Sequence, residues 1–141
     1  MKTVIAAIVP VFLLAMVQFP LNLNKQRNAV PLEGTRWNLI ELSNKTIPAN
    51  ATAKNMFLVL KSDSTVAGNG GCNAFSGNYS LGKDNEISFG DMVRTNVLCS
   101  GIDFERKYLD ALAKADHYNV NGDTLTLKNQ LVNLAKFVAG K

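Results

Sequence analysis

The chain is poor in the residues that metal and thiol chemistry require: its 141 residues include two cysteines and one histidine. Structural zinc sites take four ligands, mostly Cys and His, so two sulfurs and one imidazole fall short of such a site. The same scarcity disfavours an enzyme that activates a thiol with an imidazole. We therefore expect no metal and no cofactor.

A basic surface is also missing. The formal net charge is +4, but Lys2, Lys25 and Arg27 all precede Asn28, which leaves 12 Lys and Arg residues against 11 Asp and Glu residues in the remainder. Domains that bind nucleic acid carry clustered basic residues, often with RNA-binding aromatic motifs. The sequence shows neither, so we expect no nucleic-acid partner.

The one long apolar run lies at the start of the chain. Residues 4–19 are mostly apolar and follow Lys2, as in an export signal. The flank after the run has no clear small-residue cleavage pattern, and the run is near the lower limit for spanning a bilayer. We expect residues 1–21 to be a signal peptide or a retained signal anchor, with membrane association through residues 4–19. No cysteine follows the run to carry a lipid anchor.

The rest of the chain has the length of one domain. Residues 22–31 are polar and lack periodicity, which predicts a linker. Residues 32–138 are long enough to enclose one hydrophobic core and too short for two.

Cys72 and Cys99 are the only cysteines. In an exported chain such a pair favours a disulfide over a free reactive thiol or a metal site. By loop-closure entropy, a bridge here would contribute on the order of 3 to 4 kcal/mol, a substantial part of the stability of a small domain. We expect the protein in the periplasm or cell envelope, where thiols are oxidised.

Short apolar or alternating segments predict most of the domain as strands. Residues 36–42, 56–60 and 75–81 are examples, each followed by turn residues. Asn121 and Gly122 indicate a hairpin with a type I′ turn. Altogether we expect an α+β fold, an antiparallel, partly open β-barrel of about seven or eight short strands with one inserted helix.

Residues 102–115 change to a helical period. Their apolar positions form one stripe on a helix: Phe104, Tyr108, Ala111, Leu112 and Ala115. Ser100 or Asp103 is expected to cap the helix start. Asp110 is spaced to pair with both Arg106 and Lys114 on the solvent face.

Several landmarks occur in a fixed order along the domain. They are Gly34 with Trp37; Gly71-Cys72-Asn73 with Phe75, Gly77 and Tyr79; Thr95 with Cys99; Glu105 with Tyr108 and Leu112; and Gly122-Asp123 with Leu125 and Leu127. Together they resemble the META domain family, also called HslJ-like, whose members are mostly small bacterial envelope proteins. The resemblance implies a β-barrel interrupted by a helix, with the two cysteines close in space.

The resemblance also bears on function. The family is linked to heat-shock and antibiotic-stress responses, and an enzymatic activity is usually not assigned to it. Two departures stand out: Asn96-Val97-Leu98 replaces a more usual basic-Met-small stretch, and many relatives have an N-terminal lipid-anchoring cysteine that this chain lacks.

Our first hypothesis is a non-enzymatic exported protein that supports stress tolerance by binding another envelope component, a protein or a lipid. The second is a carrier that holds a lipid or other apolar ligand among the aromatic residues of the barrel. Those residues are Trp37, Phe57, Phe75, Tyr79, Phe89, Phe104, Tyr108 and Phe137. The third is a thiol-dependent enzyme that uses a cysteine and His117, with Asn73 or Asn119 as orienting residue. We disfavour it because a histidine just after a helix is ordinary.

Overall fold

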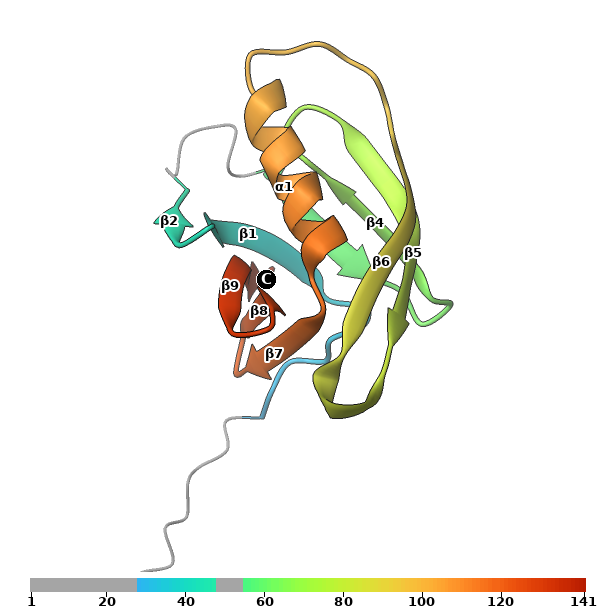
Figure 1. Ribbon diagram of the computed structural model, residues 1–141, viewed down its shortest axis with the longest axis vertical. Coiled ribbons are helices and arrows are strands. Elements are labelled where there is room, and N and C mark those ends of the chain that lie inside the picture. The colour runs from blue at the N-terminus through green and yellow to red at the C-terminus, as the bar shows by residue number, and fades with distance from the viewer. Residues whose placement is uncertain (1–27, 48–54) are drawn as a thin grey trace, which may run out of the picture.

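The computed structural model describes residues 28–47 and 55–141. The predicted leader, residues 1–21, and the first part of the predicted linker lie outside the described residues. In the described part, one antiparallel sheet curls around a single α-helix (Figure 1). None of the described helices has both the length and the apolar character that crossing a bilayer demands.

Within the described residues the sheet has nine strands, eight of which follow one continuous path in the spatial order β6-β5-β4-β3-β1-β9-β8-β7. Their bounds are β1 Arg36–Leu42, β3 Phe57–Leu60, β4 Thr65–Asn69, β5 Ala74–Leu81, β6 Ile87–Arg94, β7 His117–Asn121, β8 Thr124–Asn129 and β9 Val132–Ala139. The short β2 (Lys45–Thr46) pairs with the end of β1, and a 3-10 turn, η2 (Lys83–Asn85), precedes β6.

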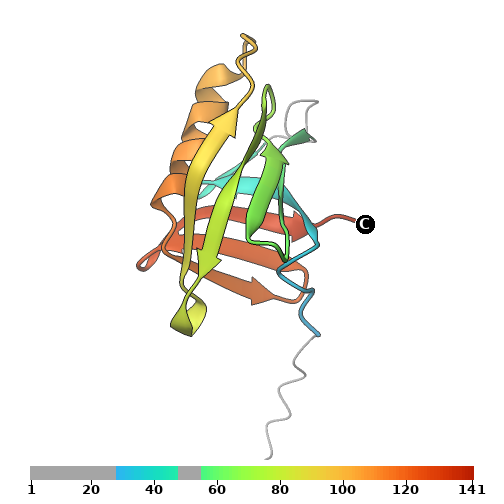
Figure 2. The same cartoon turned by 90° about the vertical axis from the view of Figure 1, so that its right-hand side faces the viewer.

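The two ends of this path, β6 and β7, meet only at one end of the barrel. There Ile87 N donates a hydrogen bond of 3.0 Å to Asp116 O, and Glu86 forms an isolated bridge with His117. The helix α1 (Ile102–Lys114) runs alongside β6, and β7, β8 and β9 lie across its lower end (Figure 2). The predicted α+β class and the partly open antiparallel barrel with one inserted helix are confirmed.

The core lies between α1 and the inner face of the sheet. Tyr108 is fully buried on the helix, with its ring centroid 5.8 Å from that of Phe75 and 6.0 Å from that of Phe137. The eight aromatic residues considered as a cavity lining fall into two groups. Trp37, Phe75, Tyr79, Tyr108 and Phe137 are buried in the core, whereas Phe57, Phe89 and Phe104 are half-buried. The buried rings therefore fill the interior with side chains.

The start of α1 differs from the prediction. Gly101 is the N-cap residue, and no side chain caps the helix, so neither Ser100 nor Asp103 has the predicted role. Asp103 already lies inside the first turn, where it pairs with Arg106 at 3.5 Å. Arg106 thus faces Asp103 in place of Asp110, whereas the predicted pair of Asp110 with Lys114 is present at 2.7 Å.

The hairpin between β7 and β8 has a different turn from the predicted one. Asn121 still pairs with Thr124, which leaves Gly122 and Asp123 as the two central residues. Only Gly122 has a positive φ, of 62°, whereas a type I′ turn needs a positive φ at both central residues. The strands pair one residue further than expected, and glycine then occupies the first central position, as in type II′ turns.

Candidate functional site

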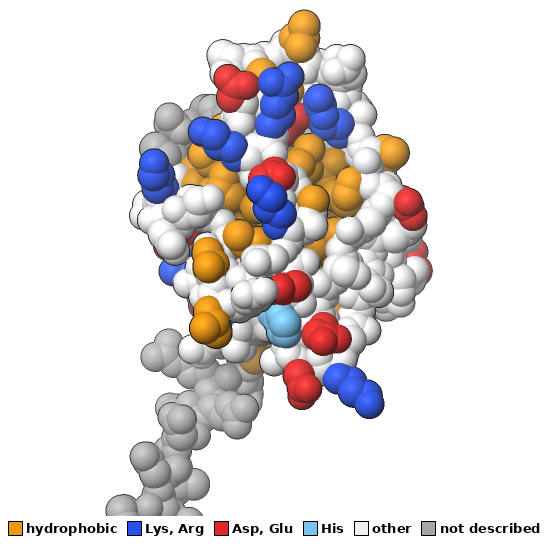
Figure 3. Space-filling view, viewed as in Figure 1, with side chains coloured by type: hydrophobic (Ala, Val, Ile, Leu, Met, Phe, Trp, Pro, Cys, Tyr) orange, Lys and Arg blue, Asp and Glu red, His pale blue; other side chains and the backbone are white. Residues whose placement is uncertain are grey.

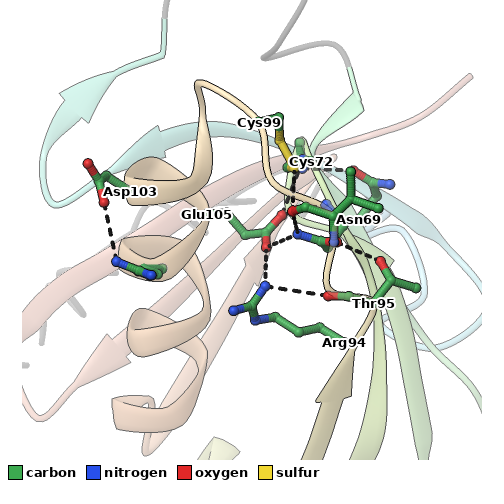
Figure 4. A network of polar contacts seen from close by, with 11 residues as sticks. Asn69, Cys72, Arg94, Thr95, Cys99, Asp103 and Glu105 are labelled. Carbon is green, nitrogen blue, oxygen red and sulfur yellow. Dashed lines mark hydrogen bonds and ion pairs between the residues drawn. A yellow bond between two sulfur atoms is a disulfide. The ribbon is translucent and has the colours of Figure 1, made fainter.

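A buried carboxylate lies at the junction of the helix, the β4–β5 turn and the segment after β6. Glu105, in the first turns of α1, is 0% exposed. Its Oε2 accepts hydrogen bonds from the backbone nitrogens of Asn73, at 2.6 Å, and Cys72, at 3.2 Å. Its Oε1 accepts from Asn73 Nδ2 at 2.9 Å, and Arg94 lies 3.4 Å away (Figure 4). A buried charge is tolerated when it is paired and hydrogen-bonded in this way.

Asn73 connects Glu105 to Thr95 and Val97 through its side-chain amide. Its side-chain oxygen accepts hydrogen bonds of 2.7 Å from both Thr95 Oγ1 and the backbone nitrogen of Val97. Its side-chain nitrogen donates to Val97 O at 3.1 Å as well as to Glu105. A side-chain amide offers two donors and a carbonyl with two lone pairs, so Asn73 uses its full capacity. We call Asn73, Arg94, Thr95 and Glu105 the Glu105 cluster.

Two glycines let the β4–β5 turn approach the carboxylate. A Cβ on Gly70 would lie 2.5 Å from Glu105 Cγ, closer than two carbons can approach. Gly71 has a φ of 103°, which side chains rarely tolerate, and its nitrogen donates a hydrogen bond of 2.7 Å to Asn69 Oδ1. The glycine-rich stretch thus shapes a carboxylate-binding turn within the protein.

The disulfide joins the β4–β5 turn to the segment that follows β6. Cys72 and Cys99 are bonded, with their Cα atoms 6.2 Å apart, within the usual range for disulfides. Cys99 is exposed and Cys72 is half-buried. The disulfide and the Glu105 cluster together hold residues 95–101, which we call the tethered loop. This loop has no regular secondary structure.

The motif residues named from the sequence divide into two sets. Gly71, Cys72, Asn73, Thr95 and Cys99 meet at the Glu105 cluster and the disulfide.

The remaining motif residues hold the sheet and core elsewhere. Trp37 is fully buried and donates a hydrogen bond of 2.9 Å to Leu32 O. Gly34 has a φ of 77°. A Cβ on Gly77 would lie 2.5 Å from Met92 Sδ. Phe75 packs edge-on against Tyr108.

Tyr79, the last of the motif residues, ties two segments to β5. Its hydroxyl contacts the Glu33 carboxylate and lies 2.7 Å from Lys61 O. Burial raises the pKa of this hydroxyl well above its usual value. It therefore serves as a hydrogen-bonding group at neutral pH.

Neither the buried acid, Glu105, nor its cationic partner, Arg94, was predicted as a site from the sequence. Glu105 was matched only as a family landmark, although it precedes Tyr108 and Leu112 by three and seven positions, which places it on the buried face of the helix. A charged residue at a core-facing position was the available signal. Arg94 had no comparable signal, because it ends an edge strand in an exposed stretch.

His117 lies at the closed end of the barrel with a different partner. Its Nδ1 is 2.8 Å from Asp116 Oδ1, and the hydrogen bond from His117 is the main reason that the pKa of Asp116 is lowered. Both sulfurs of Cys72 and Cys99 are joined to each other, so the structure does not assemble a thiol with this imidazole. Across residues 28–47 and 55–141, no three His, Cys, Asp or Glu side chains gather as metal ligands.

Among solved structures, the chain is similar to a protein from Burkholderia xenovorans, with a TM-score of 0.62 and 27% identity over 78% of this chain and 84% of that chain. A DUF4847 family protein from Bacteroides vulgatus has a TM-score of 0.59 and 15% identity over 75% of this chain and 92% of that one; at this identity the likeness shows the fold alone. No curated protein matches the chain.

The family model of the META domain matches residues 30–140, which include the whole described sheet, the helix, the Glu105 cluster and the disulfide. The motifs that carried the resemblance lie within this range. The chain belongs to the META domain family.

Proposed function

We propose that this protein is an exported, non-catalytic binding module of the bacterial envelope, which supports stress tolerance by binding another envelope component. The observation that carries this proposal is the tethered loop. A disulfide and a buried polar cluster fix the loop, and yet it presents Val97 and Leu98 to solvent with 57% and 84% of their surface exposed. Fixing a surface before association lowers the entropy that binding must overcome.

The export part of the proposal is supported by two sequence features. Residues 4–19 form an apolar run after Lys2, and the chain's two cysteines are paired. Structural disulfides persist in oxidising compartments. The stress role is supported by the links of the META domain family alone.

The non-catalytic part is supported by the contacts and the burial of the Glu105 carboxylate. All the described contacts of Glu105 come from the protein's own donors, and its side chain is closed to solvent. A general acid or base must reach a substrate proton directly or through one water. A carboxylate in this position is suited to structural support.

The proposal is tested with the full-length chain in a bacterial host. After fractionation, unreduced protein is treated with a maleimide and then reduced and treated again. Neither cysteine should react with the maleimide before reduction, because both are in the disulfide, and both should react afterwards. The protein should lie in the envelope fraction. A photoreactive residue placed in turn at Leu98, Leu131 and Lys83, which are all exposed, should give a discrete crosslinked product under envelope stress. Free thiols in a cytosolic fraction, or no product from any position, would contradict the proposal.

A further inference from the structure

We propose that Val93, Arg94, Val97 and Leu98 form a docking surface, here called the tip surface, for a protein segment that carries aliphatic side chains next to a carboxylate. This inference rests on the proposed function as a binding module and names the class of partner. It joins three observations: exposed aliphatic side chains that the protein holds in place, an apolar hollow beside them, and an arginine with unused donors at its rim.

The aliphatic side chains are exposed and held. Val93, at the end of β6, is 64% exposed, and Val97 and Leu98 follow it in the tethered loop. The backbone of Val97 is hydrogen-bonded on both sides, through its nitrogen and its oxygen, to Asn73. Apolar side chains exposed together mark interaction sites more often than single ones do.

Another exposed aliphatic pair provides a contrast. Leu131 is 95% exposed and Val132 59% exposed, at the turn between β8 and β9. That pair lies in an ordinary hairpin, without the disulfide or the Glu105 cluster. Exposure alone therefore does not distinguish the tip surface, whereas the contacts that fix it do.

A hollow of about 410 Å³ continues the tip surface along the edge of the sheet. It is lined by Ala74, Phe75, Ser76, Val93, Arg94 and Thr95. The strand β6 that borders it is at the end of the sheet path and pairs with β5 on one side. An aliphatic side chain of a partner fits such a hollow, and two of the residues that line it, Val93 and Arg94, belong to the tip surface.

Arg94 indicates that the partner carries a negative charge next to its aliphatic side chains. One of its terminal nitrogens reaches both Glu105 and Thr95 O, in each case at 3.4 Å. Within the described residues, no contact engages its other guanidinium nitrogens, and 31% of its side-chain surface is exposed. A guanidinium presents several donors in a planar fork that matches a carboxylate. A carboxylate beside the aliphatic side chains would use this fork.

The charges on the surrounding surface also favour a negatively charged partner. Figure 3 shows Lys and Arg side chains on the upper half of the face viewed there, with Asp and Glu side chains among them. Lys107 is exposed on α1, and so is Arg106, which is paired with the exposed Asp103 at 3.5 Å. Such a field favours an acidic partner and raises its association rate.

The position of the surface favours a protein over a lipid bilayer. The described chain begins at Asn28, at the end of the molecule opposite the tethered loop (Figures 1 and 2). A retained leader would reach Asn28 through residues 20–27, and each residue spans at most about 3.5 Å. A membrane holding residues 4–19 would therefore lie closer to Asn28 than to the tethered loop at the opposite end.

The test uses the oxidised protein and a phage-displayed library of random peptides as the probe. Selected peptides should combine aliphatic residues with Asp or Glu. The double variant Val97→Ser/Leu98→Ser should weaken their binding by about tenfold or more. The matched control Leu131→Ser/Val132→Ser, which removes another exposed aliphatic pair, should leave binding unchanged. Selection on Arg94→Gln, after its fold is verified by circular dichroism, should lose the preference for Asp and Glu but keep the aliphatic residues.

Several results would overturn the inference. The first two are a failure to select any peptide and an equal loss of peptide binding in the two double variants. The third is binding of vesicles of phosphatidylglycerol and phosphatidylethanolamine that depends on Val97 and Leu98. The fourth is a dimer of this protein that Val97→Ser/Leu98→Ser dissociates. Crosslinking in cells separates the two proposals. A product from Leu131 or Lys83 but none from Leu98 would support a binding module that uses a different surface, whereas no product from any position would contradict both.

Discussion

The Glu105 carboxylate accepts a hydrogen bond of 2.6 Å from the backbone nitrogen of Asn73, although 32 residues separate them in the sequence. This contact attaches the helix to the β4–β5 turn, and Asn73 in turn holds the backbone of Val97. One buried side chain thereby links the core of the domain to its exposed loop.

Replacing Glu105 with alanine should strongly destabilise the protein. The change leaves two backbone donors and the Asn73 amide without their acceptor, and it leaves Arg94 without its anion. Leaving a buried donor without its acceptor costs about 1 to 3 kcal/mol, so the free energy of unfolding should fall by several kcal/mol. Asp103→Ala, at a carboxylate with 85% of its side chain exposed, should cost less than about 1 kcal/mol. Urea unfolding of both variants measures the difference, and equal midpoints would contradict the assignment.

The glycine at position 70 should be required for the same reason. Gly70→Ala would place a Cβ 2.5 Å from Glu105 Cγ, so either the turn or the helix must move. We expect a loss of about 1 to 3 kcal/mol. Gly90→Ala is the matched control, because a Cβ there meets nothing within 4 Å. Thermal melts should show a lower Tm for the first variant only; a Tm near wild type for Gly70→Ala would show that the turn can yield.

Removing the disulfide should lower stability without removing the fold. In the chain-entropy model its loop contributes about 3 to 4 kcal/mol, while the Glu105 cluster continues to join the segments of Cys72 and Cys99. Cys72→Ser and Cys72→Ser/Cys99→Ser should be destabilised by similar amounts, because either change opens the same loop. Chemical denaturation without reductant checks this. A double variant as stable as the oxidised wild type would exclude a stabilising bridge.

Asp116 should make stability depend on pH in the acid range. The hydrogen bond from His117 lowers its pKa below the usual 3.8. A carboxyl with a lowered folded-state pKa stabilises the native state above its unfolded pKa, and this contribution disappears as the pH falls through the folded value. The Tm of Asp116→Asn should thus lie below that of wild type at neutral pH, and the gap should narrow below about pH 3.8. A gap of constant size from neutral pH to about pH 3 would contradict this account.

The sequence predicted those parts of the molecule that depend on local pattern. The apolar stripe through Tyr108 and Leu112 predicted the helix and its buried face, because apolar residues at helical spacing fall on one side of a helix and that side packs against the core. Short alternating segments specified strands for a similar reason. The turn of Gly122 was misplaced by one residue, since the register of a hairpin depends on pairing along both strands.

The candidate site was less accessible from the sequence, because it is made by long-range contacts. The motif residues Asn73 and Thr95 were named, but their joint role needs Glu105, which Asn73 meets only once the helix packs over the β4–β5 turn. Arg94 carried no pattern that distinguishes it from an ordinary exposed arginine. Polar networks of this kind connect residues of different segments, and composition and periodicity do not record such connections.

Hydrogen exchange of the Val97 amide tests the central claim most directly, namely that the exposed loop is fixed by the buried cluster. This amide donates to Asn73 Oδ1, whereas that of neighbouring Asn96 donates no hydrogen bond within the described residues. We predict that in the oxidised protein the Val97 amide exchanges about a hundredfold or more slowly than that of Asn96, and that Asn73→Ala abolishes this protection. Equal exchange at Val97 and Asn96 in the wild-type protein would contradict the account.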